Sequence, residues 1–288
     1  MSIKSILVPL DGSDESIAVL DTALIIARRF DARIKVIHVK PRTEGNLPYM
    51  LQSLPARLKK SVIAEADKKN DEQAGLIKRR FEAFCKKNKV EIVDGADGDG
   101  VVAMWHEETG STVEVLIKHA RVADAIATFR PRVTSSRLRR SPAGENLEAI
   151  MMRAGRPIVL VPPKWSPHKV SHAALAWNES LEATRAMAMT MPWLSQMKRV
   201  TLIVSRKRKE NVPEVLQYLS LHGVKAKVKY LSANIKSVGQ GILDVCTDNE
   251  VEFLVMGGFS RARSRQLVLG GVTHHLLAKA NVITVMVH

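Results

Sequence analysis

The chain has 288 residues, 45% of them hydrophobic, which is enough for one or two domains with real cores. No run approaches the roughly 20 apolar residues of a membrane span, and the short apolar run near the N-terminus is too brief for a secretory signal, so we expect a cytoplasmic protein. Two cysteines, Cys85 and Cys246, stand in unrelated contexts, which predicts reduced thiols and no disulfide framework.

The net charge of +15 raises the question of nucleic-acid binding. Residues 1–163 carry 27 Lys+Arg and 21 Asp+Glu, a net +6, and residues 164–288 carry 17 and 8, a net +9. The excess is therefore spread over both halves. Aromatic residues make up only 5% and do not alternate with basic ones, so stacking platforms for bases are not indicated. The charge suits anions generally, and nucleic acid is not the favoured partner.

In the first half, strands alternate with helices along the chain. The segment at 101–121 reads as a helix interrupted near Gly110. The strands are expected at 3–10, 33–41, 89–95, 123–129 and 156–163, and the helices at 16–32, 56–88, 101–121 and 144–155.

The second half repeats this order of elements. Its strands are expected at 172–177, 199–206, 224–231, 252–258 and 282–288, and its helices at 181–197, 212–223, 237–249 and 272–280. The proline-rich segment "PPKWSPHK" at 162–169 reads as the linker. We therefore predict two α/β domains, 1–163 and 164–288, each with a doubly wound, mostly parallel five-stranded sheet covered by helices on both faces.

In such sheets, ligands lie beyond the carboxyl ends of the strands. Two kinds of segment reach that edge. One is the turn after the first strand, at residues 10–13 and again at 177–180. The other is the loop after the fourth strand, at 129–146 and again at 257–273.

Four stretches together carry a resemblance to a known family: "ILVPLDGSDES", "GRPIVLVPP", "LSLHGV" and "LVMGGFSRARSRQLVLGGVTHHLL". They resemble a tandem-domain universal stress protein, of the UspA-like family, over nearly the whole chain. The resemblance implies the adenine nucleotide alpha hydrolase-like fold. It also implies domains paired through their last strands as a pseudo-dimer, with the same edge available for a homodimer.

The resemblance further implies an ATP loop of the form Gly-x2-Gly-x9-Gly followed by Ser or Thr. Carried over, its glycines fall on Gly257, Ser260 and Gly270, and its hydroxyl position falls on Gly271, so two positions depart from the pattern. The family's acidic residue after the first strand, which contacts adenine, corresponds to Asp11 in the first half and to Asn178 in the second.

The candidate nucleotide-binding residues all lie in these two segments of the second half. They are Ala176, Trp177, Asn178, Gly257, Gly258, Ser260, Arg261, Arg263, Gly270, Gly271, Val272 and Thr273. Glycines allow close backbone approach to phosphate, the following helix adds its dipole, and the arginines add charge. The alternative is that the glycines serve only the turn and close packing, while the arginines face solvent.

In the first half, Arg130 and Pro131 stand where the glycines would begin. This predicts a vestigial site that keeps only Pro9, Leu10 and Asp11. No metal site is predicted, because the adjacent His274 and His275 point in different directions on a helix.

The resemblance implies a stress-response regulator, non-catalytic or at most weakly ATP-hydrolysing, that binds ATP or another adenine nucleotide with magnesium in the second half. The alternative is a nucleotide-independent interaction module whose basic surface binds an acidic partner.

Overall fold

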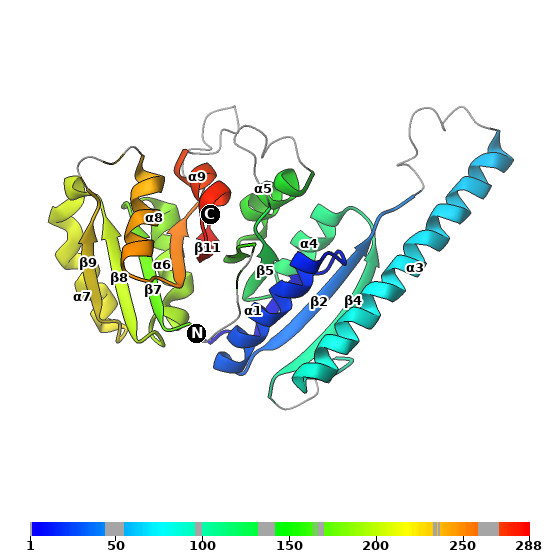
Figure 1. Cartoon of the computed structure of the whole chain (residues 1–288), viewed down its shortest axis with the longest axis horizontal. Coiled ribbons are helices and arrows are strands. Elements are labelled where there is room, and N and C mark those ends of the chain that lie inside the picture. The colour runs from blue at the N-terminus through cyan, green and yellow to red at the C-terminus, as the bar shows by residue number, and fades with distance from the viewer. Residues whose placement is uncertain are drawn as a thin grey trace.

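The computed structural model describes residues 2–43, 55–95, 100–131, 142–163, 165, 170–232, 235, 237–258 and 271–288. One continuous sheet of eleven strands runs through it in the order β3-β4-β2-β1-β5-β6-β11-β10-β7-β8-β9 (Figure 1). The strands are β1 Ser5–Pro9, β2 Arg33–Lys40, β3 Glu91–Ile92, β4 Val102–Thr109, β5 Ala125–Phe129, β6 Ile158–Val161, β7 His172–Trp177, β8 Arg199–Val204, β9 Ala226–Tyr230, β10 Phe253–Gly257 and β11 Ile283–Val287.

Helices connect the strands in both halves, as the alternating pattern predicts. They are α1 Asp14–Phe30, α3 Ala56–Asn88, α4 Thr112–Ala120, α5 Pro142–Ala154, α6 Leu181–Leu194, α7 Val212–Leu221, α8 Val238–Asp248 and α9 Gly271–Lys279, with the 3-10 helix η2 at Arg206–Asn211. Among the described residues, no helix combines the length and the apolarity needed to cross a membrane.

The two halves share one strand order. It reads β4-β2-β1-β5-β6 in the first half and β9-β8-β7-β10-β11 in the second, and the first half adds the two-residue edge strand β3. Within each half the neighbouring strands are parallel. The predicted α/β fold with mostly parallel sheets is confirmed.

One predicted element is wrong. Residues 102–109 form strand β4 and not the first part of a helix, and the helix α4 begins only at Thr112. β4 pairs with β2 over seven residue pairs, from Ile34–Ala103 to Lys40–Thr109. Ala, Met and Glu favour helix in isolation, but pairing with a buried neighbouring strand overrides that preference.

The halves meet where β6 and β11 pair antiparallel. Val159 lies opposite Val285, Ile158 opposite Met286, and Leu160 opposite Thr284. All four residues of β6 and all five of β11 are buried. In Figure 1, β11 accordingly lies in the middle of the molecule, beside the strands of the first half.

Each face of the sheet carries one hydrophobic cluster that spans both halves. Residues of α1, α3, α6 and α7 join the cluster on one face. Residues of α4, α5, α8 and α9 join the cluster on the other. Since side chains alternate along a strand, Ile6 and Val8 of β1 point to the first cluster and Leu7 to the second.

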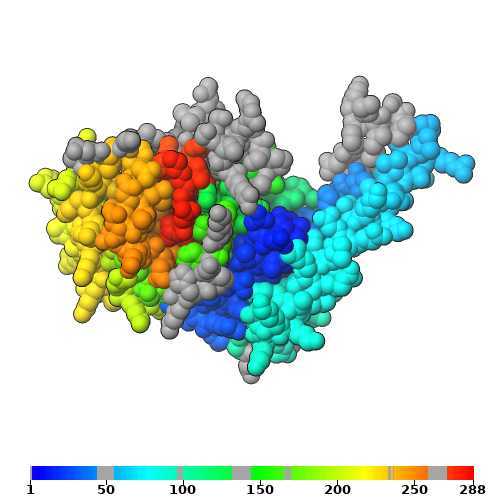
Figure 2. Space-filling view, viewed as in Figure 1, coloured from blue at the N-terminus to red at the C-terminus, as the bar shows by residue number. Residues whose placement is uncertain are grey.

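Helix α3 is much longer than the sheet needs. Its buried residues all lie in its second half, from Ala74 to Cys85. The first turns extend away from the rest of the molecule, as the cyan segment in Figures 1 and 2 shows. The helix nevertheless has anchors along its length, and these bear on the site described next.

Candidate functional site

Each half has a cavity at the carboxyl ends of its strands. The cavity of the second half, called here the half-two cavity, has a volume of about 450 Å³. Seven of the predicted residues line it: Ala176, Trp177, Asn178, Gly257, Gly271, Val272 and Thr273. The strand ends therefore bring together two segments that lie about eighty residues apart in the sequence, as the open-sheet rule requires.

The turn after β7 is built by an Asx motif and a helix cap. The side-chain oxygen of Asn178 accepts a hydrogen bond from the backbone N–H of Ser180 at 3.2 Å. Ser180 is in turn the N-cap of α6, and its Oγ accepts from the N–H of Ala183 at 3.2 Å. These two bonds hold Asn178 at the cavity wall.

Gly257 has a packing role of its own. A Cβ at this position would lie 2.5 Å from the backbone nitrogen of Ala183 and 2.6 Å from the carbonyl carbon of Glu182. Only a residue without a side chain lets the end of β10 approach the start of α6 this closely. The glycine is therefore required by the fold, whatever the cavity binds.

Gly271 differs from Gly257, because a Cβ there would meet no atom of the described residues within 4 Å. It is the first residue of α9, so the backbone N–H groups of this helix's first turn lie at the cavity. The positive end of the helix dipole lies there too. Thr273 is 4% exposed and contributes to the wall.

The second wall of this cavity comes from α8, which packs tightly on α9. A Cβ on Gly239 would lie 2.9 Å from Cβ of His275. His275 Nε2 lies 3.1 Å from Oε1 of Gln240, so a protonated Nε2 donates to it. Burial, with Lys279 and His274 nearby, lowers the pKa of His275 below its ordinary value, which favours the neutral ring.

The other predicted residues of the second half have different places. Gly258 does not line the cavity, and its N–H donates to the carbonyl of Val287 at 2.8 Å. Ser260, Arg261, Arg263 and Gly270 lie outside the described residues.

The first half has a corresponding cavity of about 340 Å³, called here the half-one cavity. Pro9, Leu10 and Asp11, predicted as the vestigial site, all line it. His38 lines it as well, with Nδ1 2.8 Å from the carbonyl oxygen of Leu10. The sequence marks His38 only as an isolated histidine, and its role as a wall residue follows from its position in β2.

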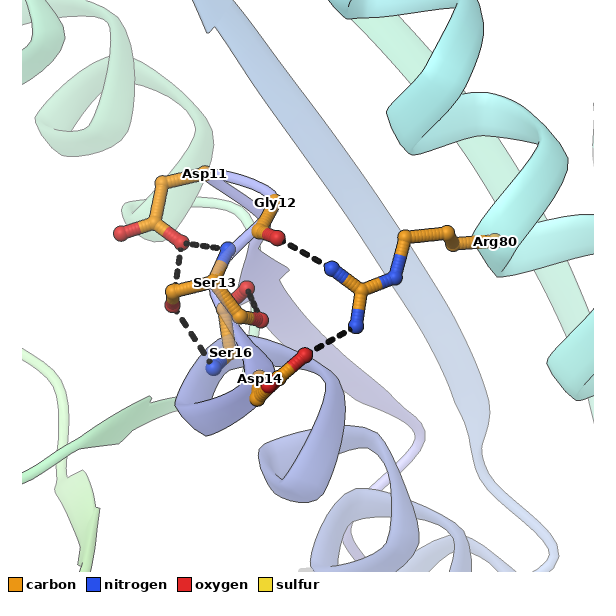
Figure 3. Close-up of polar contacts among 6 residues, drawn as sticks. All are labelled: Asp11, Gly12, Ser13, Asp14, Ser16 and Arg80. Atoms are coloured by element: carbon orange, nitrogen blue, oxygen red, sulfur yellow. Dashed lines mark hydrogen bonds and ion pairs between the residues drawn. The ribbon is translucent and has the colours of Figure 1, made fainter.

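The turn after β1 repeats the Asx motif with a carboxylate in place of the amide (Figure 3). Asp11 Oδ1 accepts from the N–H of Ser13 at 2.9 Å and from its hydroxyl at 2.6 Å. Burial raises the pKa of Asp11, but the hydrogen bonds from Ser13 and Ser16 outweigh it and leave the pKa below its ordinary value. The carboxylate is therefore ionised at neutral pH.

An arginine braces this turn in each half. Arg80 of α3 donates to the carbonyl of Gly12 and to the carboxylate of Asp14, as Figure 3 shows. In the second half, Arg208 of η2 donates to the carboxylate of Glu179. Gly12 and Glu179 both have positive φ, +87° and +62°, so the two turns share a backbone shape as well as a brace.

The ends of β5 and β10 differ between the halves. Phe129 pairs with Val161 as Gly257 pairs with Val287, so Phe129, and not Arg130 as predicted, stands where the glycines would begin. The next residue, Arg130, is 7% exposed, and its guanidinium donates across the junction to the carbonyl of Leu277 in α9. Burial lowers the pKa of Arg130.

Both cysteines are free, in keeping with the predicted reduced thiols, and both are buried. Burial raises the pKa of both thiols to about 12, with Glu82 adding to the effect at Cys85, so neither is reactive at neutral pH. Among the residues that the structure describes, no three His, Cys, Asp or Glu side chains group closely enough to hold a metal ion.

The family model of the universal stress protein family matches residues 2–162. A universal stress protein from Archaeoglobus fulgidus DSM 4304 has a similar structure, with a TM-score of 0.70 at 15% identity, covering 98% of this chain and 95% of that one. A functionally unknown protein from Pseudomonas aeruginosa PAO1 has a TM-score of 0.56 at 12% identity, covering 99% and 92%.

A universal stress protein in complex with cAMP matches at 16% identity over 56% of this chain and 98% of its own, with a TM-score of 0.31. A search of curated proteins found no match. The family model spans more than half of the chain, and the neighbours with TM-scores of 0.70 and 0.56 share the α/β fold of this chain. The chain belongs to the universal stress protein family.

Proposed function

We propose that this protein is a non-catalytic stress-response regulator that binds an adenine nucleotide in the half-two cavity, with magnesium on the phosphates. The observation that carries the proposal is the start of α9. Gly271, Val272 and Thr273 line a cavity of about 450 Å³, and none of its described wall residues is acidic. A helix N-terminus without a competing carboxylate suits phosphate.

The turn serines support binding over catalysis. Ser13 and Ser180, which lie in the turns after β1 and β7, both use their hydroxyl oxygens to cap a helix. A nucleophile needs a neighbouring general base. The Ser13 hydroxyl donates to the Asp11 carboxylate, but hydrogen bonds lower the pKa of Asp11 and make it a weak base, and the Ser180 hydroxyl oxygen is bound to the N–H of Ala183.

The two halves support an internal pseudo-dimer. We infer an approximate two-fold axis between Val159 and Val285. Exchanging the two halves converts the neighbouring pair Ile158–Met286 into the pair Thr284–Leu160. Ile158 pairs with Ile126 as Thr284 pairs with Leu254, which makes Ile158 and Thr284 equivalent. In an isologous contact of this kind, the same surface meets itself.

The proposal is tested by thermal melting with ATP, ADP, AMP and heparin, each with and without magnesium. A ligand that binds only the native state raises the melting temperature with concentration. The decisive variant is Gly271→Asp, with Gly271→Ala as its neutral control. A Cβ at this position meets none of the described residues, and an acidic residue suits a helix N-terminus but repels phosphate.

We expect ATP to raise the melting temperature of the wild type and of Gly271→Ala, and to have little effect on Gly271→Asp. Without ligand, all three should melt within a few degrees of one another. If ATP raises the melting temperature of all three proteins equally, the nucleotide binds outside the half-two cavity. If ATP raises none of them, the protein does not bind ATP.

The basic surface near β9 favours the second candidate, an interaction module for an acidic partner. The exposed residues of η2 include Arg206, Lys207 and Lys209, and the Arg206 guanidinium lies 6.0 Å from the centre of the Tyr230 ring. If heparin stabilises the protein and ATP does not, and the effect falls steeply with salt, this second function is favoured.

A further inference from the structure

The half-one cavity has the position of a nucleotide site but different chemistry. Its walls are largely apolar, with Leu10, Ile37, Leu116, Ile126, Ile150 and Ile158 among them. Its volume of about 340 Å³ lies within the range of small-molecule sites, roughly 300–1,000 Å³. Substituting the family's glycine has therefore not closed the cavity.

Phe129 alters the wall at the point where phosphate would be expected. In the second half, the bare Gly257 brings the end of β10 within van der Waals contact of the α6 backbone. In the first half, Phe129 stands at the equivalent strand end, is among the residues that line the cavity, and packs against the first hydrophobic cluster. An aromatic ring offers no N–H groups to phosphate, and it presents a face on which a flat apolar group can pack.

The electrostatics point the same way. The only ionised side chain in the described lining is Asp11, and no Lys or Arg is among those residues. Lys40, at the end of β2, is bound by Asp71 and Glu107, each at 2.8 Å, so its charge is already matched. Of the described lining residues, the only charged group that an anion would meet is the Asp11 carboxylate, whereas a cation would find its counter-ion there.

Polar groups from α3 complete the wall. Asn70 and Gln73 line the cavity from this helix. The helix is fixed beside them by the Lys40–Asp71 ion pair, by a 2.6 Å hydrogen bond from Thr43 to Asp67, and by the Arg80 brace on Gly12. These anchors lie on both sides of Asn70 and Gln73, so the wall is held in place.

We propose that the half-one cavity binds a small, largely apolar organic amine, with its ring against Phe129 and the aliphatic walls and its ammonium facing Asp11. The amine is a cation, so this ligand class is distinct from the nucleotide proposed for the half-two cavity. Neither proposal depends on the other.

The test uses the full-length protein and three indole probes of similar size and different charge: tryptamine (cationic), 3-ethylindole (neutral) and indole-3-acetate (anionic). Binding is followed by isothermal titration calorimetry and by the melting temperature. We expect saturable binding of tryptamine, with 3-ethylindole about threefold to tenfold weaker and indole-3-acetate weaker again.

Asp11→Asn is the matched variant, because Asn178 already fills the same turn position in the second half with the same backbone hydrogen bond. We expect Asp11→Asn to weaken tryptamine about threefold to tenfold and to leave 3-ethylindole unchanged. Asn146→Phe, which fills the cavity from α5, should weaken both probes at least tenfold. Gly271→Asp should alter neither, since it lies in the other cavity.

Three results would overturn the proposal. The first is no saturable tryptamine binding to the wild type. The second is binding of tryptamine and indole-3-acetate within twofold of each other. The third is a change of less than twofold in tryptamine affinity on Asp11→Asn. The Asp11→Asn variant keeps the test decisive even if Asn146→Phe fails to fold.

Discussion

Single residues at the turns after β1 and β7 hold the two cavities in shape. Gly12 has φ +87°, and a Cβ there would lie 2.8 Å from Cγ1 of Ile77 in α3. Glu179 accepts the same left-handed backbone, with its carboxylate bound to Arg208 and Asn211. A left-handed backbone costs a residue other than glycine about 1–2 kcal/mol, so at this turn the second half carries a strain that the first avoids.

Gly12→Ala is expected to lower the free energy of unfolding by about 2 kcal/mol, from the left-handed backbone and the contact with Ile77. Gly75→Ala is the control in α3, where a Cβ would meet only Arg79 at 3.9 Å. That change should raise stability by about 0.5–1 kcal/mol. Urea unfolding measures both, and equal effects of one sign would contradict the reasoning.

His172 is expected to make stability depend on pH. It is 4% exposed, and burial, with Arg199 nearby, lowers its pKa from the ordinary 6.5. The unfolded chain therefore takes up the proton first, so the contribution is fully present above pH 6.5 and is lost as the pH falls through the folded pKa. His172→Gln should flatten the decline in unfolding free energy between pH 7 and pH 5, as measured by urea titration. An unchanged slope would exclude His172 as its source.

The residue scale also shows what the sequence can predict of the site. Asn178, Gly271 and Thr273 could be placed at one cavity because strand ends in a parallel sheet meet at one edge. The contact of Gly257 with α6 could not be read from the motif, since a glycine spacing does not say what approaches it. The place of the half-one cavity was predicted through Pro9, Leu10 and Asp11, but its apolar character was not, because its α3 wall lies in a segment with no motif.

At the scale of elements, most strands and helices follow from the hydrophobic period, and β4 does not. The stretch "VVAMWHEET" mixes helix formers with β-branched and aromatic residues, so its hydrophobic periodicity does not distinguish a strand from a helix. Its strand form depends on β2, a partner more than sixty residues earlier. Because β4 occupies the place beside β2, the short strand β3 pairs with β4 and lies at the edge of the sheet.

Two contacts connect the ends of β5 and β10 to helices of the opposite half. Arg130 reaches Leu277 of α9, and a Cβ on Gly258 would lie 3.1 Å from Met151 of α5. α9 lines the half-two cavity and α5 lines the half-one cavity. Each cavity is therefore lined by a helix, α5 or α9, that also lies against the opposite half at the β6–β11 junction.

Arg130→Ala is expected to lower the free energy of unfolding by about 2 kcal/mol, because it removes a charge-assisted hydrogen bond and buried side-chain volume. Arg130→Met retains the volume and removes a desolvated charge, so it should cost less than half as much. Chemical unfolding of the two variants compares them. A larger loss for Met than for Ala would show that packing is not part of the effect.

At the scale of the whole molecule, one sheet and two clusters that span both halves predict cooperative unfolding. We expect a single calorimetric transition for the wild type, with the van't Hoff and calorimetric enthalpies equal. Val159→Asp places a carboxylate at a fully buried position opposite Val285, which should cost more than about 3 kcal/mol and separate the halves into two transitions. A single transition of unchanged enthalpy in Val159→Asp would contradict the prediction that the β6–β11 pairing couples the unfolding of the two halves.

The pairing of β6 with β11 within one chain has a consequence for how the two halves can change. In a dimer of identical chains, every substitution appears at both related positions, so Asp11 and Asn178, or Phe129 and Gly257, could not differ. A single continuous polypeptide removes that constraint. One gene can then adjust each half separately while the shared ladder at Val159 and Val285 continues to hold them together.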